Sequence, residues 1–177
     1  MFKLFFKIFK TKKNLVYLNN DEKSDIFLVG QEIKVKVKKL FKGSLAIRQI
    51  DAGSDNACEQ ELMALSNGFY DIERFGIHFV ASPRHADMLL ITGPVTRNMA
   101  KAVKDAYDAT PNPKIVVAVG DDAISGGLFA GSYAISGGVD SVLPVNYCIP
   151  GDPPTPKEII IGLLKIINEV DIKKSEL

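Results

Sequence analysis

Residues 114–120 read KIVVAVG, an apolar run that ends in a glycine and leads into acidic residues. A second such run, DMLLITG, occupies residues 87–93. Each run predicts a strand that is buried on both of its faces. The intervening segment predicts a helix over residues 97–109, which two prolines bring to an end. A strand, a helix and a second strand in this order are typical of a parallel sheet that is covered by helices.

The flanking sequence continues this alternation. Further strands are predicted at residues 44–51 (SLAIRQID), 77–82 (IHFVAS) and 139–145 (VDSVLPV), and further helices at 55–66 and 156–170. Ser54 or Asp55 can cap the first of these helices, and Pro156 lies near the first position of the second. We therefore predict an α/β fold, a flavodoxin-like three-layer sandwich with a mainly parallel sheet.

Residues 1–42 are interpreted as a basic N-terminal extension, residues 43–170 as the α/β domain and residues 171–177 as a tail. The alternating stretch QEIKVKVKKL at 31–40 indicates one or two short strands, or an ordered arm against a partner. The first residues form an amphipathic pattern, with Phe2, Phe5, Phe6 and Phe9 on one helical face and Lys3, Lys7 and Lys10 on the other. Residues 2–10 therefore predict either contact with an anionic membrane surface or a membrane subunit, or else docking on another partner or a frayed end.

Composition excludes several classes of function. The formal net charge of +1 gives no indication of nucleic-acid binding, and two cysteines cannot make the framework of a disulfide-stapled secreted domain. No apolar run approaches the length of a membrane span, so we expect a cytoplasmic protein. The Gly-rich residues 120–138 lack both the phosphate-loop and the dinucleotide fingerprints, and no catalytic dyad or triad can be assembled. We therefore expect no catalytic residues in this chain alone.

Three loops follow predicted strands, and the carboxyl ends of parallel strands are where function gathers. They read DAGSDNACE (51–59), VGDDAISGG (119–127) and IPGDPPTP (149–156). With the segments between them, they make residues 43–164 similar to the small, cluster-bearing subunit of membrane-bound energy-converting [NiFe] hydrogenases of the formate hydrogenlyase type. The equivalent subunit of respiratory complex I is a close relative of that family.

This resemblance implies one [4Fe-4S] cluster held by four cysteines from the three loops, passing electrons to or from a large catalytic subunit. The family's ligand positions correspond here to Asp55, Cys58, Asp122 and Asp152, so three of the four cysteines are replaced by aspartate. Scattered drift would give mixed residues, so the replacements indicate either deliberate substitution or selection for carboxylates. The Asp55-x-x-Cys58 spacing favours the hydrogenase branch over the complex I branch, which has two adjacent cysteines.

Iron–sulfur clusters are held by soft thiolates, so we expect cluster binding by this donor set to be absent or very weak. If the loops converge, mutual repulsion of the three carboxylates and their burial should raise at least one carboxyl pKa or else keep the site wet. A hard divalent cation on Asp55, Cys58, Asp122 and Asp152 is the alternative, but we favour an empty site. The chain is then an electron-transfer subunit, or else a cluster-free structural subunit or an engineered apo variant.

The resemblance also implies partners. Glu59, Arg84 and His85 match family residues that are expected to face the large [NiFe]-hydrogenase-like subunit, although Glu59 can equally serve the first turn of its helix. Membrane subunits are the other expected partners, which predicts a cytoplasmic protein peripheral on the inner face of the cell membrane. Cys148 is interpreted as a small buried hydrophobe at a strand end rather than as a relocated ligand.

Overall fold

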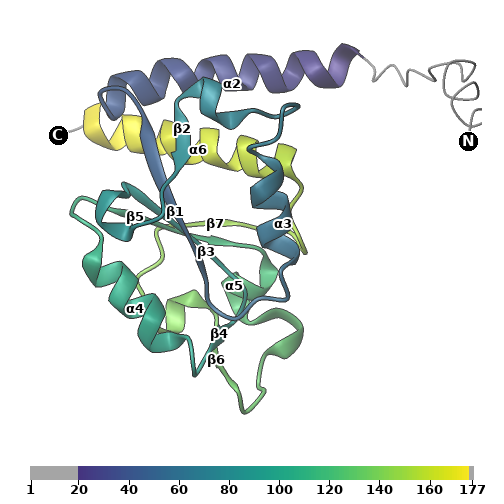
Figure 1. Cartoon of the computed structure of the whole chain (residues 1–177), viewed down its shortest axis with the longest axis vertical. Helices are drawn as coiled ribbons and strands as arrows, with labels where there is room; N and C mark the ends of the chain where they lie inside the picture. The colour runs from purple at the N-terminus through teal and green to yellow at the C-terminus, as the bar shows by residue number, and fades with distance from the viewer. Residues whose placement is uncertain (1–19, 176–177) are drawn as a thin grey trace, which may run out of the picture.

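A parallel sheet forms the centre of the molecule. The computed structural model describes residues 20–175, and the side chains of residues 26–172. Within this part of the chain the main sheet has five strands in the order β2-β1-β3-β5-β7, and every neighbouring pair is parallel. The strands are β1 (Leu45–Asp51), β2 (Ile77–Phe79), β3 (Met88–Thr92), β5 (Ile115–Val119) and β7 (Tyr147–Ile149). The predicted parallel sheet is confirmed, and its carboxyl ends meet at one edge (Figure 1).

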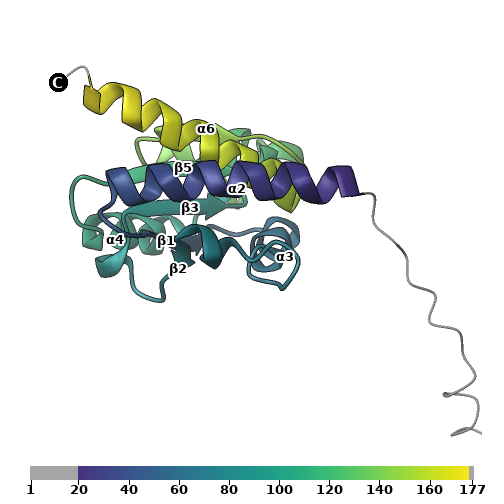
Figure 2. The same cartoon turned by 90° about the horizontal axis from the view of Figure 1, so that it is seen from above.

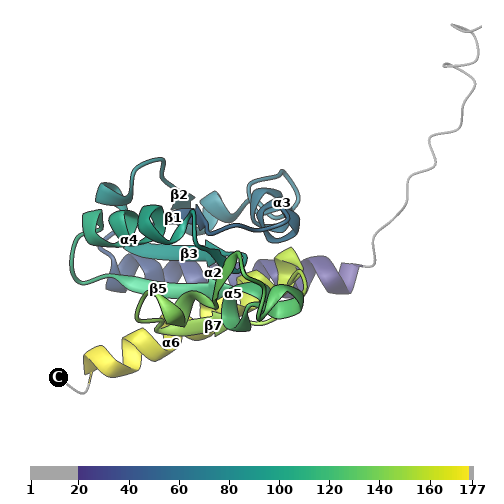
Figure 3. The same cartoon turned by 90° about the horizontal axis from the view of Figure 1, so that it is seen from below.

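Helices cover both faces of this sheet. On one face lie α2 (Asn20–Leu40), α3 (Ala57–Ala64) and α6 (Pro156–Ser175), and on the other lie α4 (Ala100–Ala109) and the short α5 (Asp121–Ser125). Figures 2 and 3 show the two sides of this arrangement. Residues along β3 alternate between the two cores, with Met88 and Leu90 toward α2 and α6, and Leu89 and Ile91 toward α4. The three-layer, flavodoxin-like sandwich is therefore confirmed, and both runs that predicted doubly buried strands are buried on both sides.

The strands predicted from the alternation in residues 31–40 are wrong, because this stretch belongs to helix α2. Its β-branched residues suit a strand locally, but Ile33 and Val37 are one helical turn apart and are fully buried against α6 and the turn at residues 72–75. Gly30, one turn earlier, lets the helix lie directly on the Phe75 ring. Tertiary packing here overrides the local preference. The amphipathic pattern over residues 2–10 lies outside the described residues.

The strand predicted at 139–145 is also wrong. Residues Val139–Ser141 form a 3-10 turn, and the chain joins the edge of the sheet only at Asn146, whose amide and side chain pair with Val116. Pro144 cannot donate a ladder hydrogen bond, which explains why the strand starts after it. The Gly-rich segment also contributes β6 (Ile135–Gly137), which pairs antiparallel with β4 (Val95–Thr96).

The last helix, α6, begins as predicted and continues beyond the expected end at residue 170 as far as Ser175. Thr155 and Glu158 cap it reciprocally: the Thr155 amide donates to the Glu158 carboxylate at 2.8 Å, and the Glu158 amide donates to Thr155 Oγ1 at 3.4 Å. Pro156 occupies the first helical position, where its missing N–H costs nothing. The division of the chain after residue 42 stays a prediction.

Candidate functional site

The first loop of the site is shaped by its own short polar side chains. Asp51 Oδ1 accepts hydrogen bonds from the amides of Gly53 and Ser54 at 2.7 and 2.8 Å, and Asp55 Oδ1 accepts one from the Ala57 amide at 2.9 Å. Asn56, with φ of 75°, is the residue that precedes α3, rather than the predicted Ser54 or Asp55. The loop therefore enters α3 so that Cys58 falls in its first turn.

The second and third loops are joined directly to each other. Gly120 donates its amide to the Ile149 carbonyl at 2.9 Å, and Asp121 donates its amide to the Gly151 carbonyl at 2.9 Å. The Gly151 amide in turn donates to Asp121 Oδ1 at 3.0 Å. These three bonds hold the start of α5 against the loop before α6. Sequence reasoning missed Asp121, whose position directly before a predicted ligand position was the available signal.

Both joined loops pass beside the Cys58 thiol. A Cβ atom built on Gly120 would approach Cys58 Sγ to 2.5 Å and the Gly151 carbonyl oxygen to 3.5 Å. Gly120 also has φ of 91°, which side-chain-bearing residues rarely adopt. A glycine is therefore required where the three loops meet, and Cys58 is the buried centre of the meeting point.

The electrostatics show that all four predicted ligand positions share this space. Burial is the largest cause that raises the pKa of the Cys58 thiol, and the negative charges of Glu59, Asp55, Asp122 and Asp152 contribute after it in that order; together they raise this pKa from 9.0 to about 12. The structure thus brings the four predicted residues together at the carboxyl edge of the sheet, and the thiol among them is protonated at neutral pH.

Asp122 shows the predicted effect of crowding among the carboxylates. Its pKa is raised, first by burial and then by Asp152, with smaller contributions from Asp55 and Asp121. A hydrogen bond from the Leu128 amide acts in the opposite direction. The expectation that at least one carboxyl pKa would rise is confirmed for this residue.

The donor set does not fit the cluster that the resemblance implies. A [4Fe-4S] cluster is held by thiolates, usually four of them, whereas this site offers one protonated thiol and three carboxyl groups. Among residues 26–172, moreover, no group of three or more histidine, cysteine or acidic side chains is arranged to hold a metal ion. The residues are close enough to interact electrostatically without forming a coordination shell.

Glu59 lies on the inner side of α3. Its Oε1 atom accepts a hydrogen bond from Thr92 Oγ1 at the end of β3, and its Oε2 atom is buried with no hydrogen-bond partner among the described residues. Sequence reasoning missed Thr92, although a threonine at the polar end of an apolar strand was a visible signal. The role predicted for Glu59 toward a large subunit stays a prediction.

The other predicted residues lie elsewhere. Arg84 and His85 are exposed in the turn that precedes β3, at the opposite end of the sheet from the ligand loops. Arg84 and His85 could therefore contact the same partner as the ligand loops only if that partner extended around the molecule. The expectation that Cys148 is buried is wrong, because it lies exposed in the edge strand β7.

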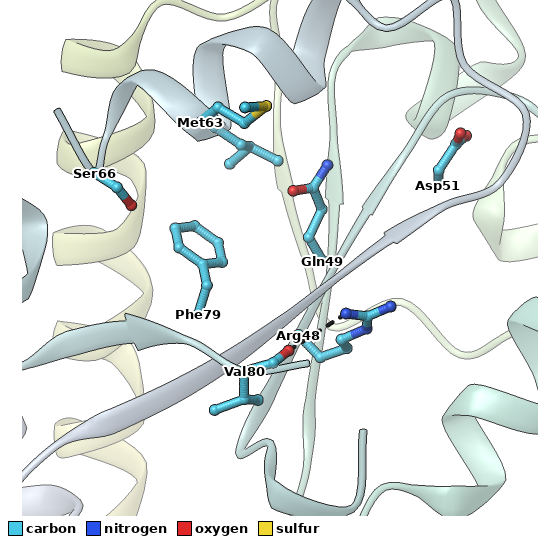
Figure 4. Close-up of a pocket in the computed structure, with 8 residues that line it drawn as sticks. Arg48, Gln49, Asp51, Met63, Ser66, Phe79 and Val80 are labelled. Atoms are coloured by element: carbon cyan, nitrogen blue, oxygen red, sulfur yellow. Dashed lines mark hydrogen bonds between the residues drawn. The ribbon is translucent and has the colours of Figure 1, made fainter. Parts of the chain in front are cut away.

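A groove of about 550 Å³ adjoins the site between β1, β2 and α3 (Figure 4). Phe79, Val80 and Met63 supply apolar walls, and Arg48 also lines the groove, with its Nη1 atom donating to the Val80 carbonyl oxygen at 3.4 Å. Asp51, at its end toward the loops, is already engaged by the amides of the first loop. The groove therefore presents a largely apolar surface with one cation beside the meeting point of the loops.

Comparisons with known proteins point to one family. The family model described as NADH ubiquinone oxidoreductase, 20 Kd subunit, matches residues 56–166. Formate hydrogenlyase subunit 7 of Escherichia coli is 40% identical over 141 residues, which cover 80% of this chain and 55% of the relative, so the chain spans about half of that protein. The probable membrane-bound hydrogenase subunit mbhJ of Pyrococcus furiosus is 41% identical over 121 residues, 68% of this chain and 72% of the relative.

A solved structure gives the same result. The membrane-bound sulfane sulfur reductase, an archaeal respiratory membrane complex, contains a chain that matches with a TM-score of 0.63 and 35% identity, over 72% of this chain and 70% of that chain. Within residues 20–175 no helix combines the length and the hydropathy needed to cross a membrane. The match over most of the described domain assigns the chain to the family of the NADH ubiquinone oxidoreductase 20 Kd subunit.

Proposed function

We propose that this chain is the small subunit of a membrane-associated assembly of the [NiFe] hydrogenase or complex I type. In this family the small subunit passes electrons beside a large catalytic subunit, and we assign this chain to the same place. The observation that carries the proposal is the proximity of Asp55, Cys58, Asp122 and Asp152 at one edge of the sheet, in a chain whose residues 56–166 match the family model. The names of the membrane-bound hydrogenase subunit and of the membrane-bound sulfane sulfur reductase support the membrane location.

The chain fills that place without a normal [4Fe-4S] cluster. Three hydrogen bonds between the second and third loops hold the edge together from protein atoms alone. Its role is then structural, positioning the large subunit on the membrane part of the assembly. The same conclusion holds whether selection or design introduced the aspartates.

The surface toward the large subunit is proposed to include the lobe between α5 and β6. Leu128 and Tyr133 are 91% and 87% exposed there, and Phe129 lies beside them. Exposed apolar side chains in one small lobe are typical of an interface. The lobe begins after α5, and the Asp122 carboxylate lies against Gly127 at its start. A partner that covers the lobe would therefore also cover the meeting point of the loops.

Purification of the tagged full chain from its source cells in mild detergent tests this proposal. We expect the large hydrogenase-like subunit and membrane subunits to co-purify, and Leu128→Ser with Tyr133→Ser to lower the yield of the large subunit. Ile172→Ser, which removes an exposed apolar side chain from α6, is the control and should keep it. Recovery of the chain without a large subunit would contradict the proposed function.

A further inference from the structure

One side of helix α2 combines exposed apolar and cationic side chains. We name this surface the outer face of α2, and define it as Leu28, Lys34, Val35 and Lys38 on the helix together with Lys42 in the turn directly after it, all of which are exposed. Leu28 and Val35 are 67% and 69% exposed and stand two helical turns apart. The opposite side of the helix faces the core, and α2 lies on the outside of the molecule in Figures 1 and 2.

The charge of this segment is strongly one-sided. Residues 27–42 contain five lysines and one glutamate, although the whole chain has a formal net charge of only +1. Lys36 pairs with Glu32 at 3.3 Å and Lys39 with Asp171 at 2.8 Å. The other three lysines are Lys34, Lys38 and Lys42. They form no ion pair with any side chain that the structure describes. Lys34 and Lys38 are one helical turn apart on α2, and Lys42 follows in the turn just beyond the end of the helix at Leu40.

The surface continues at both ends of the helix. At the C-terminal end, Lys42 lines a pocket of about 350 Å³ together with Arg84 and His85, where Asp87 is the acidic neighbour and accepts a hydrogen bond from the Ala46 amide. Toward the N-terminal end, Leu28 borders a groove of about 390 Å³ between α2 and α6. The other lining residues of that groove are Ile26, Val29, Lys157, Ile160 and Ile161. The outer surface is thus cationic beyond the C-terminal end of α2, mixed along the helix, and apolar toward its N-terminal end.

We propose that the outer face of α2 docks on an anionic lipid surface. Lysine is depleted in protein–protein interfaces, so these three unpaired lysines are poorly suited to a protein partner. Apolar side chains between lysines on one helical face suit a membrane boundary, where the apolar groups enter the acyl edge and the ammonium groups reach the headgroups. The inference deepens the proposed function, because it names the surface that meets the membrane, but it requires neither a cluster nor a large subunit.

Vesicle co-sedimentation with the purified full chain tests the inference. The probes are phosphatidylcholine vesicles with and without phosphatidylglycerol. The test variant combines Lys34→Gln, Lys38→Gln and Lys42→Gln. The control combines Lys101→Gln, Lys104→Gln and Lys165→Gln, which removes the same charge from exposed positions on α4 and α6. A lysine near an anionic membrane strengthens binding by about fivefold, so the test variant should bind on the order of a hundredfold more weakly.

We expect the wild type to bind only the vesicles that contain phosphatidylglycerol, the control variant to follow it, and Leu28→Ser with Val35→Ser to weaken binding without a change of charge. Equal losses in the test and control variants would overturn the inference, because charge alone would then account for binding. Unchanged binding by the test variant would also overturn it and would place the contact elsewhere, for example in residues 2–10. If the Lys34→Gln, Lys38→Gln, Lys42→Gln variant still bound vesicles but no longer co-purified with membrane subunits, the outer face of α2 would be a protein interface instead. Because the assay uses the isolated chain, its failure leaves the large-subunit test above unaffected.

Discussion

The Cys58 thiol provides a titration that reports directly on the geometry of the site. Burial and four nearby acidic side chains raise its pKa from 9.0 to about 12. At any pH below about 9 the thiolate fraction is therefore about a thousandfold smaller than that of an ordinary cysteine. Because the thiolate is the nucleophile, alkylation should be slowed by the same factor, before any effect of limited access.

The assay measures the rate of iodoacetamide alkylation between about pH 7 and about pH 10 in a Cys148→Ser background, which removes the exposed second cysteine. For the folded protein the rate should rise about tenfold per pH unit without reaching a plateau, because the pKa lies above this range. The same protein in denaturant should level off above about pH 9, because an ordinary thiol is already half ionised near that pH.

Neutralising the neighbours provides the test of cause. Replacement of Asp55, Asp122 and Asp152 by asparagine should lower the Cys58 pKa only part of the way, because burial is the largest cause and Glu59 remains. A rate that levels off above about pH 9 in the folded Cys148→Ser protein would refute the reasoning, since it would mean that the thiol is neither buried nor surrounded by these carboxylates.

Three further changes test separate parts of the structure. Gly30→Ala should lower the free energy of unfolding, because the added methyl group would overlap the Phe75 ring. The overlap costs about 1–3 kcal/mol, and the gain in helix propensity is about 1 kcal/mol. A variant that is more stable than the wild type in urea titration would contradict the packing of α2. Thr155→Ala should cost about 1 kcal/mol by removing the cap of α6, whereas Thr155→Ser should keep most of it, as thermal unfolding would measure. Asp122→Asn should stabilise the protein at pH 7. The pKa of Asp122 is higher in the folded than in the unfolded state, so the folded state binds the proton more tightly. The stability that this proton contributes is fully present below the unfolded pKa of 3.8 and is lost as the pH rises through the folded pKa. Equal melting temperatures of Asp122→Asn and the wild type from acidic to neutral pH would show that the carboxylate is not crowded.

The sheet and the place of the site could be predicted from the sequence because their signals are local and redundant. The apolar runs at 87–93 and 114–120 can be satisfied only by burial on both faces, and that requires helices on each side. Parallel strands then bring the loops after them to one edge, so the proximity of Cys58, Asp122 and Asp152 follows from topology. The crowding of the aspartate carboxylates around Cys58 could therefore be predicted without knowledge of side-chain geometry.

The remaining features depend on tertiary contacts that no local pattern contains. Residues 31–40 alternate like a strand, and only the packing of Ile33 and Val37 against α6 makes them helical. The edge strand begins at Tyr147, beyond Pro144, so Cys148 is exposed rather than buried. The pairing of Thr92 with Glu59 joins residues 33 positions apart, and no spacing in the sequence predicts it.

The content of iron and acid-labile sulfide in the anaerobically purified and reconstituted chain is the most direct test of the central claim. The comparison is between the wild type and the variant that combines Asp55→Cys, Asp122→Cys and Asp152→Cys. Because the loops already converge on Cys58, the account predicts about four irons per chain in the triple variant and no more than background in the wild type. A wild-type protein that holds as much iron and sulfide as the triple variant would contradict it.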